Sequence, residues 1–191
     1  AEEARSVVLL DACPGVEFQE HPARIEFELG GETYSHFPDI LVCARAMELR
    51  EFWECKRDHE VEDIFIRIRA RRLTELLEPL GYGYRLVSTS CLQKASYYEN
   101  AITLRRDAAA LQLMHDSVWT HREIAAAVDA CVAGKPLDAR HGAGAAAQQH
   151  ALLYLGKLSA DLAMPLCEAS AFWLPKGDSK PWVWELFERS S

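Results

Sequence analysis

The alternation of apolar and charged residues between residues 23 and 56 constrains the fold more than any other feature of the chain. Ile25, Phe27 and Leu29 alternate with charged neighbours, which is typical of a strand with one buried face. Gly30-Gly31 then predicts a hairpin turn. Strand patterns resume over residues 33–43, where Pro38 interrupts them, and again over 47–55. We therefore expect a three-stranded meander over residues 23–56.

Helical patterns lie on both sides of this meander. They cover residues 2–11, 60–80, where Ile68 is an expected core residue, and 97–115, and a short strand is expected over 84–88. This order of elements predicts an α/β fold in which helices flank a mixed sheet.

The composition changes after residue 108, where alanine becomes frequent. Thr120 and Glu123 form a capping box at the start of a helix expected over residues 120–132. A second helix is expected over 143–157, and a β-wing over 158–174. We therefore divide the chain into a sheet-containing domain, residues 1–108, and a small helical, winged-helix-like domain, residues 109–191, that binds DNA or a partner.

The aromatic segment near the C-terminus contains Trp182, Trp184 and Phe187. We interpret it as a segment that closes the core or docks on a partner. Base stacking is the alternative.

The charge and the cysteines exclude several classes of protein. The chain has 191 residues, 29 of them acidic against 21 Lys and Arg, and its net charge of −8 argues against bulk electrostatic binding to nucleic acid. Six cysteines without a CxxC pair indicate reduced thiols in a cytoplasmic protein. No segment has the length of a membrane span or the pattern of a signal peptide. Because the chain starts without Met inside a helical pattern, we expect that upstream residues are missing.

Pro38-Asp39 and Glu54-Cys55-Lys56 are the residues that carry chemistry, because each group ends an expected strand. Glu54 and Lys56 are two positions apart and should point to one face, with Cys55 toward the core. Two carboxylates suit Mg²⁺ or Mn²⁺, which would polarise a phosphate and activate water, and the ammonium of Lys56 would orient that water or offset negative charge. The alternative is an ordinary charge pair on a strand.

Further motifs follow a recognisable order along the chain. They are Glu3, Cys13-Pro14-Gly15-Val16, Glu20-His21-Pro22, Pro38-Asp39, Glu54-Cys55-Lys56, the segment 84–89 that begins with Tyr84, and the segment 100–104 that begins with Asn100. In this order the chain resembles the restriction-endonuclease-like superfamily of PD-(D/E)xK nucleases, and within it the TnsA-type endonuclease subunits of heteromeric transposases. The resemblance covers residues 3–106 and, more weakly, the helical tail. His21 departs from it, since glutamine is usual there.

The resemblance implies roles for individual residues. Asp39, Glu54 and Lys56 would be catalytic, and Glu3 would join Asp39 and Glu54 as a ligand of Mg²⁺ or Mn²⁺. Glu2 is the alternative to Glu3, and Glu3 could also be an exposed helix charge. His21 would approach the phosphate or the metal, or be a packed turn residue.

Arg67 and Arg71 are further candidates for DNA contact, because they are i,i+4 neighbours on the long helix. The alternative is that both belong to a solvated helix face.

Two classes of function follow. The first is a metal-dependent DNA endonuclease, a hydrolase that cuts phosphodiester bonds at transposon ends during DNA transposition and recombination. By the resemblance, it would act with a transposase subunit and an ATPase regulator. The second is a stand-alone repair or phage-type nuclease, or a non-catalytic structural subunit that has kept the motif.

Overall fold

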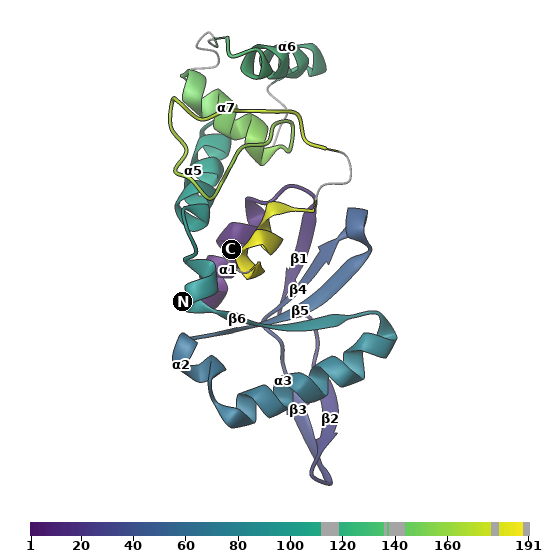
Figure 1. Cartoon of the computed structure of the whole chain (residues 1–191). Helices are drawn as coiled ribbons and strands as arrows, with labels where there is room; N and C mark the ends of the chain where they lie inside the picture. Colours follow the sequence, from purple (N-terminus) through teal and green to yellow (C-terminus); the bar gives the residue numbers. More distant parts are fainter. Residues whose placement is uncertain (112–118, 136, 138–143, 177–179, 189–191) are drawn as a thin grey trace.

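A four-stranded mixed sheet forms the centre of the molecule (Figure 1). The computed structural model describes residues 1–111, 119–135, 137, 144–176 and 180–188. The strands lie in the order β1-β4-β5-β6; β4 is antiparallel to β1 and β5, and β6 is parallel to β5. They span Val16–Glu20 (β1), Ile40–Ala44 (β4), Leu49–Lys56 (β5) and Gly83–Ser88 (β6). The predicted mixed sheet flanked by helices is thus confirmed as a mixed α/β fold.

The predicted meander over residues 23–56 has the predicted antiparallel pairings, but its middle strand is two strands that belong to different sheets. Ile25–Leu29 (β2) and Glu32–His36 (β3) form a separate two-stranded hairpin, whose turn is Gly30-Gly31 as predicted, with φ of 63° and 87°. Pro38, which has no backbone N–H to donate, separates this hairpin from β4. β4 pairs with β5 as predicted, and its other edge pairs with β1, a strand that the sequence pattern did not indicate.

Helices cover both faces of the sheet. In Figure 1, α3 and the β2–β3 hairpin lie on one side, and α1 with the C-terminal segment lies on the other. The α-helices are Glu2–Asp11 (α1), Asp58–Val61 (α2), Ile64–Leu77 (α3), Thr89–Leu92 (α4), Tyr97–Ala110 (α5), His121–Val132 (α6) and Ala145–Tyr154 (α7), and 3-10 turns span Arg45–Met47, Glu78–Leu80 and Trp182–Phe187. The predicted helix end near His115 and helix start at Ala143 lie outside the described residues. No helix in the described ranges is long and apolar enough to cross a membrane.

Two hydrophobic clusters lie on opposite sides of the sheet, and β5 contributes a residue to each. Phe52 packs with Leu73 and Leu77 beneath α3, whereas Trp53 belongs to the larger cluster on the α1 side. Ile68 is 42% exposed, so the prediction that it lies in the core is wrong. The apolar residues of α3 lie around more than one face, and the sheet buries the later ones.

The C-terminal aromatic segment closes the larger cluster. The ring of Trp53 lies 6.3 Å from that of Trp184 and 5.3 Å from that of Phe187, in edge-on geometry. This confirms the core-closing interpretation.

The proposed boundary at residue 108 falls within α5, and the division into two domains stays a prediction.

The expected β-wing over residues 158–174 is absent from this fully described segment, which has one isolated bridge, Ser159 to Trp173. The buried side chain of Asn100 binds backbone groups of this segment. Its Nδ2 donates to the carbonyls of Leu162 (2.9 Å) and Met164 (2.8 Å), and its Oδ1 accepts from the N–H of Leu166 (3.0 Å).

The capping box of Thr120 and Glu123 at α6 is confirmed.

Candidate active site

Glu54 and Lys56 share one face of β5, as their spacing predicts. Lys56 Nζ lies 3.1 Å from Glu54 Oε1. Cys55 points to the opposite face, where its Sγ lies 3.2 Å from the hydroxyl of Ser6 on α1. Burial raises the pKa of Cys55 to about 12, so this residue is a neutral thiol at neutral pH.

Three further side chains reach the Glu54 carboxylate, and the sequence analysis assigned a role at the site to none of them. Arg69 of α3 forms an ion pair with Oε1, the Tyr84 hydroxyl donates to Oε2 at 2.5 Å, and His36 Nε2 lies 3.6 Å from Oε2. His36 also lies 2.7 Å from the Tyr84 hydroxyl. Glu54 is consequently only 1% exposed.

The sheet register explains why Tyr84 reaches Glu54. Tyr84 of β6 lies opposite Phe52 of β5, and Glu54 is two positions beyond Phe52 on the same face. The register of β5 and β6 is therefore the information that would have identified Tyr84 as a partner of Glu54, and the sequence alone did not supply this register.

Glu54 is an ionised carboxylate in spite of its burial. Burial opposes its ionisation, but the hydrogen bond from Tyr84 and the charges of Arg69 and Lys56 outweigh that effect and lower the pKa of Glu54 below 4.5. Burial, together with the charge of Glu54, raises the pKa of Tyr84, which stays a neutral donor. Burial also lowers the pKa of His36 below 6.5, which leaves its ring neutral at pH 7.

Asp39 lies beside the same strand end, immediately before β4. Its Oδ2 accepts a hydrogen bond from the backbone N–H of Cys55 at 2.6 Å, and its own N–H donates to the carbonyl of Trp53 at 3.0 Å. This hydrogen bond holds the Asp39 carboxylate against the backbone of Cys55, the residue between Glu54 and Lys56.

Glu3 and His21 lie next to Asp39, on the side that α1 covers. His21 Nε2 is 3.4 Å from Glu3 Oε1, and the His21 N–H donates to the Asp39 carbonyl at 2.8 Å. Glu2 instead accepts from the hydroxyl of Thr89 (3.2 Å). Of the two candidate acids, Glu3 is therefore the one that is linked to Asp39, through His21. Its helix covers the face opposite to that of Glu54.

Arg67 and Arg71 lie away from this cluster, on the exposed side of α3. Arg71 pairs with Glu75 at 3.1 Å. Arg69 is two residues from each of them and so about 200° around the helix, which turns it toward Glu54. The predicted contact of Arg67 and Arg71 with DNA stays a prediction.

The donor atoms of this site suit Mg²⁺ in kind, but their arrangement is closed. Mg²⁺ is commonly held by one or two carboxylates together with water and phosphate oxygens, which Asp39 and Glu54 could provide. However, Arg69 and Lys56 already compensate the Glu54 carboxylate. Among the described residues, no group of three His, Cys, Asp or Glu side chains is arranged to hold a metal ion. A cation can therefore reach Glu54 only if at least one of its basic partners moves.

Arg69 keeps one buried donor atom that is not used within the described residues. Its Nε is buried without a hydrogen-bond acceptor in the part of the chain that the structure describes. A buried donor without a partner costs about 1–3 kcal/mol, so an incoming anion would compete well for this guanidinium.

Comparisons of the chain with protein-family models, with curated proteins and with solved structures give no match.

Proposed function

We propose that the chain is a metal-dependent DNA endonuclease that hydrolyses phosphodiester bonds at transposon ends as a subunit of a transposase complex. One observation carries the proposal: the Asp39 carboxylate accepts a hydrogen bond from the backbone N–H of Cys55, the residue between Glu54 and Lys56. Two carboxylates and one ammonium therefore belong to one strand end. The mixed sheet flanked by helices supports the finer assignment to a restriction-endonuclease-like fold, and α6 and α7 support a helical tail after residue 108.

The proposed cofactor is Mg²⁺ or Mn²⁺, held by Asp39 and Glu54, with Glu3 as a further candidate. When bound, such a cation would polarise the scissile phosphate and lower the pKa of a coordinated water. Lys56 would offset the negative charge that develops on the phosphate. In this proposal Arg69 leaves Glu54 for a DNA phosphate, so that DNA binding opens the site.

The net charge indicates that the chain depends on partners. An acidic protein gains little attraction to DNA from counterion release. We therefore expect the isolated chain to bind and cut DNA poorly, and a transposase subunit and an ATPase regulator to deliver the DNA end.

The experiment that tests this proposal is cleavage of labelled DNA containing a transposon end, in Mg²⁺, by the chain alone and with its transposase partner. We expect cleavage only with the partner, and its loss in Asp39→Asn. The exposed variant Glu75→Gln is the control. Efficient cutting without a partner at physiological salt would instead indicate a stand-alone nuclease.

A non-catalytic subunit is the second candidate, and the closed state of Glu54 favours it. A carboxylate that is buried and fully paired is also what a purely structural ion cluster contains. The two candidates differ for Asp39→Asn: a structural subunit would support transposition with this variant as well as with the wild type.

A further inference from the structure

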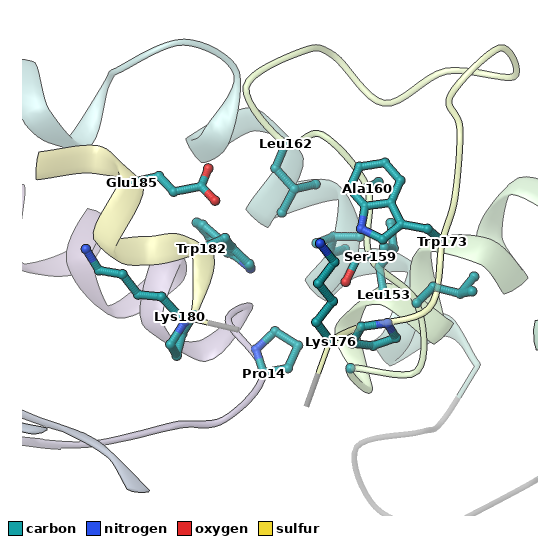
Figure 2. A pocket seen from close by; sticks show the side chains of 15 residues that line it. Pro14, Leu153, Ser159, Ala160, Leu162, Trp173, Lys176, Lys180, Trp182 and Glu185 are labelled. Carbon is teal, nitrogen blue, oxygen red and sulfur yellow. The ribbon is translucent and has the colours of Figure 1, made fainter. Parts of the chain in front are cut away.

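A cavity of about 260 Å³ lies at the opposite end of α1 from Glu3 (Figure 2). Pro14 lines it just after α1, a helix about 15 Å long, so the cavity is separate from the Asp39 and Glu54 cluster. The other walls come from the end of α7, the segment 158–162 and the C-terminal segment. Its most distinctive lining residues are Trp173, Trp182, Lys176, Lys180 and Glu185.

The two indole rings of the cavity have different surroundings. Trp182 stacks on Tyr97, with ring centres 5.7 Å apart and planes at 12°. The backbone of Trp173 exchanges hydrogen bonds of 2.8 and 3.0 Å with that of Ser159, another lining residue. The Trp173 side chain is nevertheless 43% exposed. A large aromatic ring that is this exposed offers a flat surface to a ligand.

The charges in the cavity favour an anionic ligand. In Figure 2 the ammonium of Lys176 lies between the two indoles, whereas Lys180 extends away from Trp173. Glu185 is the acidic lining residue, and its carboxylate accepts a hydrogen bond of 2.5 Å from the Tyr97 hydroxyl. Lys180 is paired with Glu188 at 3.1 Å. Lys176 is therefore the cation that is placed to meet a ligand in the cavity.

The floor of the cavity depends on a glycine. Gly156, which ends the turn after α7, has a φ of 66°, and a Cβ built there would lie 2.8 Å from Cβ of Pro14. The absence of a side chain lets the α7 end pack directly on the turn after α1. The two sides of the cavity are thus held together by close packing.

We infer that this cavity binds one unstacked nucleotide of single-stranded DNA, with its base on the exposed ring of Trp173 and its phosphate near Lys176. Stacking on aromatic side chains combined with a basic group is how single strands are bound without sequence preference. The volume is below the range of about 300–1,000 Å³ typical of pockets for drug-sized ligands, which suits a single base. This site would hold a displaced or terminal strand and does not depend on the catalytic proposal.

The test is fluorescence anisotropy of a labelled oligo-dT single strand with the full chain, in the presence of EDTA so that cleavage cannot occur. We expect Trp173→Ala to weaken binding about five- to 150-fold, the loss typical of one stacked base, and Trp173→Phe to restore most of it. Lys176→Ala should reduce the slope of log K against log salt by about 0.7. Lys157→Ala, an exposed lysine outside the cavity, is the matched control and should leave binding unchanged.

Competitors distinguish the possible ligands. Unlabelled dTMP should compete weakly and a duplex of the same sequence poorly. Competition by inorganic phosphate as strong as that by dTMP would show a simple anion site and overturn the inference. So would unchanged binding by Trp173→Ala with an intact circular dichroism spectrum, or binding of a tryptophan-containing peptide in place of DNA. Asp39→Asn should retain single-strand binding, so failure of the nuclease proposal would be seen separately.

Discussion

Replacing Arg69 by alanine tests the electrostatic structure of the candidate site. Glu54 is 1% exposed and ionised, and Arg69 is one of its two cationic partners. Breaking a fully buried ion pair by removing one partner costs about 3–5 kcal/mol. Arg69 is 29% exposed, and Lys56 and Tyr84 remain bound to Glu54. We therefore expect a smaller loss, about 2 kcal/mol, which corresponds to a decrease of about 4–8 °C in Tm for a chain of this length.

The assay is urea and thermal unfolding followed by circular dichroism at pH 7. Arg71→Ala is the matched control on the same helix, because Arg71 is 84% exposed and its pair with Glu75 should contribute little. Arg69→Met keeps most of the side-chain stem but removes the charge, so it should be destabilised nearly as much as Arg69→Ala. If Arg69→Ala unfolds at the same urea concentration as Arg71→Ala, the cluster around Glu54 does not have the energetic role described above.

Three further predictions concern separate parts of the structure. Asp39→Ala should abolish Mg²⁺-dependent cleavage in the partner complex and lower the unfolding free energy by no more than about 3 kcal/mol, the upper value for one hydrogen bond to a charged group, as measured by cleavage and urea unfolding in parallel. The folded-state pKa of Glu54 lies below its ordinary 4.5, so the stability it contributes is present above about pH 4.5 and is lost as the pH falls through the lowered value; Glu54→Gln should reduce this acid-limb dependence in unfolding measured against pH. Gly156→Ala should lower Tm more than Gly134→Ala, because both glycines have positive φ but only the Cβ at Gly156 would meet Pro14, and equal shifts in Tm would contradict this.

Local features of the site could be predicted from the sequence because they depend on near neighbours. The period of a strand places Glu54 and Lys56 on one face whatever the rest of the chain does. Gly30-Gly31 specified its turn through the φ values that glycine tolerates. The capping box at Thr120 is likewise local.

Features that depend on distant partners could not be predicted. The apolar positions of α3 are compatible with more than one buried face, so the pattern favoured Ile68 for the core and did not show that Arg69 faces the sheet. Asn100 binds backbone groups more than 60 positions along the chain, and nothing local to residues 158–174 shows that those groups are already paired. β1 was missed because its short pattern acquires meaning only through its pairing with β4.

The most direct test of the central claim is divalent cation binding at Asp39 and Glu54. Electron paramagnetic resonance of Mn²⁺ can be recorded with the full chain in the presence of duplex DNA containing a transposon end, for the wild type, Asp39→Asn and the exposed-carboxylate control Glu75→Gln. We predict that Mn²⁺ binds to the wild type and to Glu75→Gln, and that Asp39→Asn weakens this binding at least about tenfold, a loss of about 1.4 kcal/mol. Equal Mn²⁺ affinity in the wild type and Asp39→Asn would contradict the claim that this strand end is a metal-dependent nuclease site.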